Sequence, residues 1–189
     1  SGQVLHCPYE ADKARIIMME MADALSLDLV SKGLVTDQLV VTIGYDSKSL
    51  ETLGCDYTGK IKVNHYGKKV PEHAHGTTNL KRKTSSTKLI IQAAIELYDR
   101  IVDKNLLIRR LNLSANHLVD EKEAQEETTY EQYNLFTDYD RLEKQKKEEN
   151  AALEKERKLQ QAMLDIKSRF GKNAVLKGTN FLEGATARE

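Results

Sequence analysis

The residues best suited to chemistry in this sequence are one cysteine and three histidines in its first half. Cys55, His65, His73 and His75 carry thiolate and imidazole groups, which are ligands that zinc prefers. Their spacing matches no compact zinc motif, and a strand also brings the two residues of a His-x-His pair to one face. We therefore expect no metal site, although the four residues are the candidates if one exists.

Catalytic patterns are not evident either. The sequence shows no glycine-rich phosphate-binding loop, no Ser-His-Asp arrangement in a motif context and no carboxylate pair that strand ends would bring together around a metal. We therefore expect this chain to be non-catalytic and to hold no cofactor.

Binding chemistry is indicated instead by a basic and polar cluster in the middle of the chain. Lys81, Arg82 and Lys83 form a run of cations, which is often only a solvated edge. Hydroxyl, amide and further cationic side chains accompany it here, and such groups suit phosphate oxygens. The residues that we expect to contact nucleic acid are Thr77, Asn79, Lys81, Arg82, Lys83, Arg109, Arg110, Asn112, Ser114 and Asn116.

The distribution of charge supports the same interpretation. The 189 residues have a formal net charge of zero, but residues 60–88 carry +7 and residues 120–140 carry −7. A basic patch followed by an acidic segment predicts that the basic part of the chain binds a polyanion and that the acidic part does not.

The elements around the cluster are a strand, a helix and a second strand. Residues 76–83 are extended in character, and four hydroxyl residues, 84–87, offer N-caps for a helix over residues 88–103. Residues 106–119 read as a strand in which apolar and polar side chains alternate. The sequence thus predicts a sheet with one apolar face and one polar face.

The first part of the chain supplies a matching unit. Residues 2–5 suggest a strand, residues 10–32 a long helix that Gly33 ends, and residues 36–45 another strand. Residues 46–71 read as a long loop or a frayed hairpin. We predict an α+β fold of order β-α-β-β-α-β, with a four-stranded sheet and both helices on one face, followed by a charged helical extension.

The composition changes after residue 120. We assign residues 1–120 to the binding domain, 121–137 to an acidic linker, 138–170 to a charged helix and 171–189 to a tail. Within the linker stands an isolated apolar cluster that contains Gln132, Leu135 and Phe136.

The basic and polar segments resemble a known family. Residues 73–80, 84–90 and 109–116 are similar to the little-finger domain of Y-family translesion DNA polymerases, and the Gram-positive branch of the ultraviolet-damage repair polymerases fits best. The resemblance extends to residues 2–5 and 169–178 and is weakest over residues 46–70 and 139–156. It implies a domain that lays its sheet in the DNA major groove and grips phosphates of the template and primer strands.

The resemblance also implies that the catalytic part lies outside this chain and that the chain binds a protein partner. The palm, with its Mg-binding carboxylates and nucleotidyl transfer, would precede Ser1, so we expect a fragment of a longer polymerase that acts in SOS-type damage tolerance. The Gln-x-x-Leu-Phe pattern of Gln132, Leu135 and Phe136 is similar to the peptide by which bacterial polymerases bind the sliding clamp. The alternative is that Leu135 and Phe136 fold back onto the domain.

Two cysteines suggest no disulfide framework, and the sequence shows no signal peptide and no long apolar run. We therefore expect a monomeric cytoplasmic fragment that binds primer–template DNA and the clamp and no membrane. Two other functions stay open: an autonomous single-stranded nucleic-acid-binding module, and a structural adaptor whose charged helix pairs with a partner.

Overall fold

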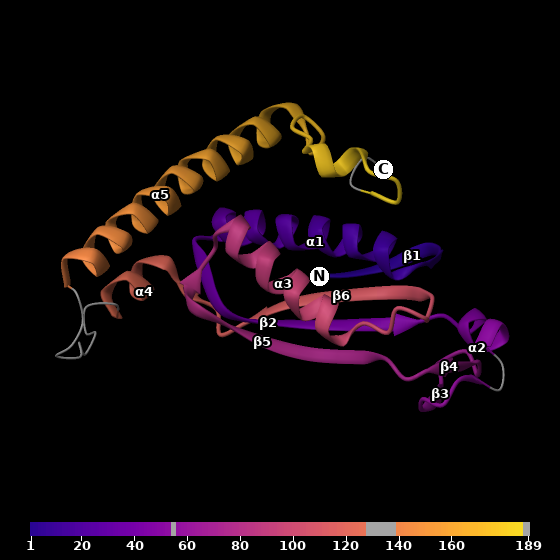
Figure 1. Ribbon diagram of the computed structural model, residues 1–189. Helices are drawn as coiled ribbons and strands as arrows, with labels where there is room; N and C mark the ends of the chain where they lie inside the picture. The colour runs from indigo at the N-terminus through magenta and orange to yellow at the C-terminus, as the bar shows by residue number, and fades with distance from the viewer. Residues whose placement is uncertain (54–55, 128–138, 187–189) are drawn as a thin grey trace.

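The computed structural model describes residues 1–53, 56–127 and 139–186 (Figure 1). The elements follow in the order β1 (Gly2–Tyr9), α1 (Ala11–Lys32), β2 (Leu34–Tyr45), α2 (Lys48–Leu53), β3 (Ile61–Val63), β4 (Lys69–Pro71), β5 (Ala74–Thr84), α3 (Thr87–Ile101), β6 (Ile108–Asn116), β7 (Val119–Asp120), α4 (Glu121–Glu127), α5 (Tyr139–Phe170) and the 3₁₀ helix η2 (Gly178–Phe181).

The centre of the fold is an antiparallel sheet with the strand order β1-β6-β2-β5. The short strand β7 continues the sheet by pairing with the first residues of β2. Helices α1 and α3 lie side by side on one face of this sheet (Figure 1). The predicted α+β fold with two helices on one face of the sheet is confirmed, and β7 adds a fifth strand to the four that the sequence predicted.

The hydrophobic core lies between this sheet and the two helices. Strand β2 contributes alternate residues, Leu39, Val41 and Ile43, all fully buried. Leu111 and Leu113 of β6 lie beside them in register. Helices α1 and α3 complete the core with a set of buried apolar side chains: Ala14, Ile17, Met18, Ile90, Ala94 and Leu97. Because every second strand residue enters this core, the intervening residues face the opposite side of the sheet.

Both helix boundaries that the sequence indicated have a local physical cause. Gly33 ends α1 in the left-handed conformation, with φ of 66°, which glycine adopts without a steric penalty. Ser86 begins α3, and its hydroxyl accepts a hydrogen bond from the Leu89 N–H at 3.3 Å.

The segment between β2 and β5 is more regular than expected. It contains helix α2, which no pattern in the sequence predicted, and the hairpin β3–β4, which agrees with the predicted frayed hairpin. Asp46 favours the helix, because its carboxylate accepts a hydrogen bond from the Lys48 N–H at 2.9 Å. Glu51 adds a negative charge in the first turn of α2.

The acidic stretch after residue 120 also begins differently from the expected linker. Residues 121–127 form helix α4, and the Asp120 carboxylate accepts a hydrogen bond from the Lys122 N–H at 2.9 Å. Acidic residues in the first turn favour such a helix, and Glu121 also pairs with Arg157 of α5. The predicted clamp-binding residues Gln132, Leu135 and Phe136 lie outside the described residues.

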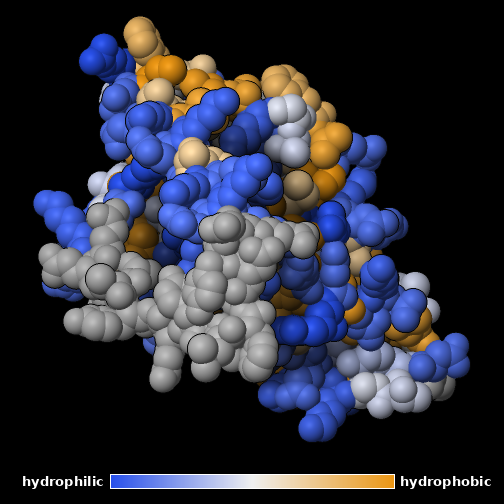
Figure 2. All heavy atoms as spheres, turned by 60° about the vertical axis from the view of Figure 1, so that its left-hand side comes forward, coloured by the Kyte–Doolittle hydropathy of each residue, from blue (hydrophilic) through white to orange (hydrophobic). Residues whose placement is uncertain are grey.

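Helix α5 matches the predicted charged helix, and it packs against the domain. It contacts α1, and the chain after Gly171 returns toward the helical layer, where η2 also contacts α1 (Figure 1). Asp23 of α1 pairs with Lys177, and Glu20 accepts hydrogen bonds from Asn180 and Thr186. Hydrophobic surface is nevertheless visible at the top of Figure 2, and Leu159, Ile166 and Phe170 of α5 are exposed.

Candidate nucleic-acid interface

The polar side chains of the predicted interface are brought together by strand register. On β2, Gln38 lies opposite Asn79 of β5 on one side and Asn116 of β6 on the other. Two residues further along β2, Val40 lies between Thr77 and Ser114. The next row joins His75, Thr42 and Asn112.

We call this surface the open face, because it is the side of the sheet opposite α1 and α3. Six of the predicted binding residues are brought onto it by register: Thr77, Asn79, Arg110, Asn112, Ser114 and Asn116. The expected alternation on β6 is therefore present, with Arg110, Asn112 and Ser114 facing away from the helices.

The open face is ordered by hydrogen bonds between its own side chains. The Gln38 amide donates to the Asn79 side-chain oxygen at 3.0 Å and accepts from the Asn116 amide, also at 3.0 Å. A third bond joins the Thr42 hydroxyl and the His75 Nδ1 atom at 2.9 Å. These rows hold amide and hydroxyl groups in fixed positions across three strands, which reduces the entropy lost when they bind a ligand.

Gln38 and Thr42 are members of this surface that the predicted site omitted. The sequence held a signal for them, because both alternate with the buried apolar residues of β2. Their position between β5 and β6 makes them the centre of the polar rows.

The three consecutive cations of β5 do not share one surface. From Asn79 to Thr84, β5 advances five residues while β2 goes back only two, from Gln38 to Thr36, so the pairing is irregular around Lys81, Arg82 and Lys83. Arg82 reaches helix α5, where its guanidinium lies 3.4 Å from the Glu149 carboxylate. Lys81 is exposed and Lys83 is half-buried.

The neighbouring arginines of β6 also differ from each other. Gly44 of β2 lies opposite Arg110, and a Cβ atom at Gly44 would come within 3.2 Å of the Arg110 Cβ. The glycine therefore gives the Arg110 side chain room on the open face. Arg109 lies at the register shift, and its Nε atom is 3.9 Å from the Asp46 carboxylate.

The open face has a chemical character suited to a regular anionic backbone. Over the described ranges it presents amides, hydroxyls, the Arg110 guanidinium, the His75 imidazole and apolar Val40, but no Phe, Tyr or Trp side chain. Stacking of unpaired bases normally uses such aromatic rings. Hydrogen-bond donors without rings suit phosphate and sugar contacts better.

A metal site would need several His, Cys, Asp or Glu side chains close together in the described part of the chain. No group of three or more His, Cys, Asp and Glu residues there lies close enough to hold a metal ion. His65, His73 and His75 belong to that part, whereas Cys55 does not. None of the described helices is both long enough and apolar enough to cross a membrane.

Comparison with known proteins identifies the family of this domain. Residues 7–128 match the family model described as the impB/mucB/samB family C-terminal domain, which spans more than half of the chain and covers the whole sheet except the first residues of β1. No match to the chain was found among the curated proteins. The chain therefore belongs to the family of impB/mucB/samB C-terminal domains, which form part of the Y-family DNA polymerases.

Proposed function

We propose that this chain is a non-catalytic duplex DNA-binding domain of an error-prone translesion polymerase. The observation that carries the proposal is the open face, a platform of amide, hydroxyl and cationic groups whose opposite side is covered by α1 and α3. Family membership supports the same conclusion.

The mechanism is contact with the phosphate backbone and not with base edges. Arg110 on the open face supplies positive charge, and the amide row centred on Gln38 supplies donors for phosphate oxygens. Lys81, exposed further along β5, adds a second cation. Phosphate contacts are indifferent to sequence, which suits a polymerase that must hold a damaged template whose backbone is still regular.

Salt dependence of binding to a blunt duplex tests this mechanism. If about four to six phosphates are neutralised, the logarithm of the association constant should fall with the logarithm of salt concentration at a slope of roughly −4 to −5. Two duplexes of unrelated sequence should give the same slope. A flat response, or strong preference for one sequence, would contradict the proposal.

A second part of the proposed function is attachment to the bacterial sliding clamp. Its support is the sequence pattern of Gln132, Leu135 and Phe136, in which an amide can meet backbone groups while two apolar side chains fill a pocket. Phe136→Ala should abolish clamp binding in a pull-down assay and leave duplex affinity unchanged. Loss of both activities would mean that the two sites are not separate.

We place this domain in a cytoplasmic polymerase of the Gram-positive ultraviolet-damage repair branch, whose palm would supply Mg-dependent nucleotidyl transfer. The packing of α5 against α1 favours a monomer over an adaptor that pairs through α5. Light scattering of the 189-residue chain should give a monomer mass, and a stable dimer would favour the adaptor function.

A further inference from the structure

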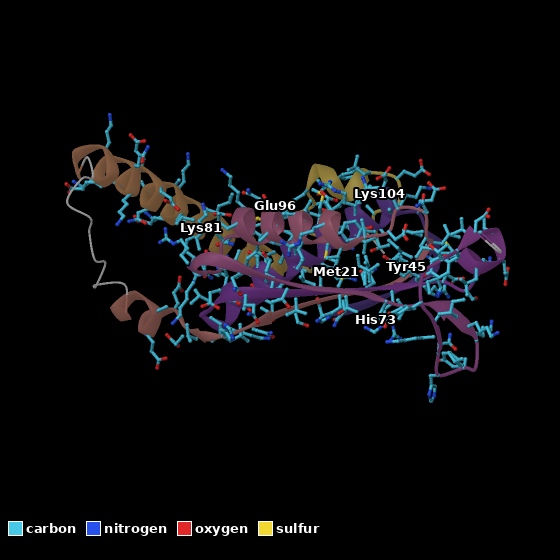
Figure 3. All side chains as sticks on the ribbon, turned by 60° about the horizontal axis from the view of Figure 1, so that its bottom comes forward. Met21, Tyr45, His73, Lys81, Glu96 and Lys104 are labelled. Atoms are coloured by element: carbon cyan, nitrogen blue, oxygen red, sulfur yellow. The ribbon has the colours of Figure 1, made fainter. Side chains whose placement is uncertain are left out.

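A cleft adjoins the open face at the end where the hairpin β3–β4 leaves the sheet. Its volume is about 1210 Å³, and one wall is the sheet end with Val4, Thr42 and Arg110, while the other includes Lys62, Tyr66 and Lys68 of the hairpin segment. The hairpin projects from the side of the sheet opposite α1 and α3 (Figure 1), and Figure 3 shows His73 near its base. The cleft is therefore continuous with the open face.

The hairpin tip has a defined shape. The Asn64 side-chain oxygen accepts hydrogen bonds from the N–H groups of Tyr66 and Lys68, both at 3.0 Å. The Asn64 N–H donates to the Lys68 carbonyl at 2.9 Å, and Gly67 adopts the left-handed conformation that the turn requires, with φ of 74°. These bonds fix the backbone of the turn that carries Tyr66.

The base of the hairpin is fixed as well. The Glu72 N–H donates to the Lys60 carbonyl at 2.8 Å, and the Lys62 ammonium lies 2.5 Å from the Glu72 carboxylate. Pro71 is buried where the hairpin returns to the sheet. The hairpin therefore forms a fixed wall of the cleft.

The cleft carries a positive charge and an unpacked aromatic ring. Five Lys and Arg residues line it against two acids, Asp46 and Glu51: Lys48, Lys62, Lys68, Arg109 and Arg110. Tyr66 is 84% exposed, and its ring lies edge to face against the imidazole of His65 with centroids 5.5 Å apart. An exposed aromatic ring beside cations is the arrangement that binds single-stranded nucleic acid, because the ring stacks on an unpaired base while the cations follow the backbone.

We infer that this cleft binds the single-stranded DNA that extends from the duplex on the open face. The inference rests on the proposed function, because the strand reaches the cleft from a duplex held by the sheet. Arg110 belongs to both surfaces. The phosphate backbone of the DNA strand therefore stays next to a positive charge as it passes from the open face to the cleft. In the described ranges the open face has no Phe, Tyr or Trp ring for stacking, and its His75 imidazole is hydrogen-bonded to Thr42, whereas the cleft has exposed Tyr66. This difference assigns duplex to the first and single strand to the second.

The test compares two fluorescent DNA probes on the full chain at one salt concentration. One probe is a blunt duplex, and the other is the same duplex with a single-stranded thymidine extension of about six nucleotides, within the usual span of a single-strand site. The wild-type chain should bind the extended probe more tightly. Tyr66→Ala should lower affinity for the extended probe by about fivefold or more and leave blunt-duplex affinity unchanged.

Two control variants make the result specific. Tyr66→Phe keeps the ring and should keep the gain from the extension. Phe170→Ala removes another exposed aromatic ring, on α5 and outside the cleft, and should change neither affinity. Circular dichroism should show that all variants are folded.

The outcomes separate this inference from the proposed function. If the wild-type chain binds blunt duplex but gains nothing from the extension, or if Tyr66→Ala weakens both probes equally, the single-strand assignment is wrong and the duplex function stands. If neither probe binds, the proposed function itself fails and the inference fails with it.

Discussion

The Nε2 atom of Gln160 lies 2.9 Å from the hydroxyl oxygen of Ser26, although the two residues are 134 positions apart in the chain. Gln160 comes from the charged helix α5 and is only 4% exposed. The same amide lies 3.0 Å from the Ser85 carbonyl and 2.8 Å from the Thr87 hydroxyl. A buried polar cluster thus joins α5 to the start of α3 and the middle of α1.

Neighbouring contacts of α5 strengthen this attachment. Glu156 accepts hydrogen bonds from the Ser86 hydroxyl at 2.6 Å and from the Lys88 N–H at 3.0 Å. A carboxylate at the N-terminus of α3 satisfies unpaired donors and interacts favourably with the helix dipole. The extension is therefore part of the folded domain over this stretch.

Gln160→Ala should lower the free energy of unfolding by about 1–3 kcal/mol, because a buried cluster loses the donor that links its three oxygens. Urea denaturation followed by circular dichroism measures the effect. The matched control is Gln161→Ala, since Gln161 is exposed and its amide donates to Asp165 one helical turn away, and its effect should stay within about 0.5 kcal/mol. Equal effects would mean that Gln160 does not anchor α5.

Gly76→Ala should also destabilise the fold, by about 1–3 kcal/mol, because an added methyl would overpack the interface between β5 and α3. Its Cβ would lie 2.9 Å from methyl carbons of both Leu97 and Ile101. Thermal denaturation of this variant should be compared with Gly178→Ala, where a Cβ would meet nothing within 4 Å. A Gly76 variant as stable as the Gly178 variant would show that the helix shifts without cost.

Arg110→Ala should make the salt dependence of blunt-duplex binding less steep by about one unit of slope, since one phosphate contact is lost. Arg82→Ala should change the slope less, because the Arg82 guanidinium is directed to Glu149 and Asn150 of α5. Fluorescence anisotropy at several salt concentrations gives both slopes. If Arg82 has the larger effect, the DNA surface includes the edge of β5 next to α5, and the open face is not its centre.

Alkaline pH should destabilise the domain through Tyr98. Burial raises the pKa of the Tyr98 phenol above its ordinary value of 10.0, and the charges of Tyr45 and Asp99 act in the same direction. Above about pH 10 the unfolded chain loses this proton while the folded chain keeps it, so the stability due to this group is full below that pH and is lost as pH rises.

The expected contribution of Tyr98 is a fall of about 1.4 kcal/mol per pH unit, measured as urea unfolding at a series of alkaline pH values. Tyr98→Phe should make the fall shallower without abolishing it, because burial also raises the pKa of Tyr45. Exposed Tyr66→Phe is the control and should keep the wild-type slope. An unchanged slope in the Tyr98 variant would contradict the assignment.

The sequence alone determined the elements whose pattern repeats locally. Leu111 and Leu113 alternate with Asn112 and Ser114, and this period of two defines a strand with one buried face in any tertiary context. Gly33 ended α1 as expected, because the left-handed conformation after a helix is a local property of glycine. These features were enough to predict the sheet, its two helices and most of the open face.

Only the tertiary structure decided which way several polar residues face. Lys81, Arg82 and Lys83 are consecutive cations, but irregular pairing with β2 and the approach of Glu149 direct Arg82 to α5. The cleft beside Tyr66 has no sequence pattern, because the two strands of its hairpin are three residues each and too short for a period. In the sequence, Gln160 is one polar residue among many in a charged helix. Its burial depends on the packing of α5 on α1, because the partners of its amide are distant in the chain.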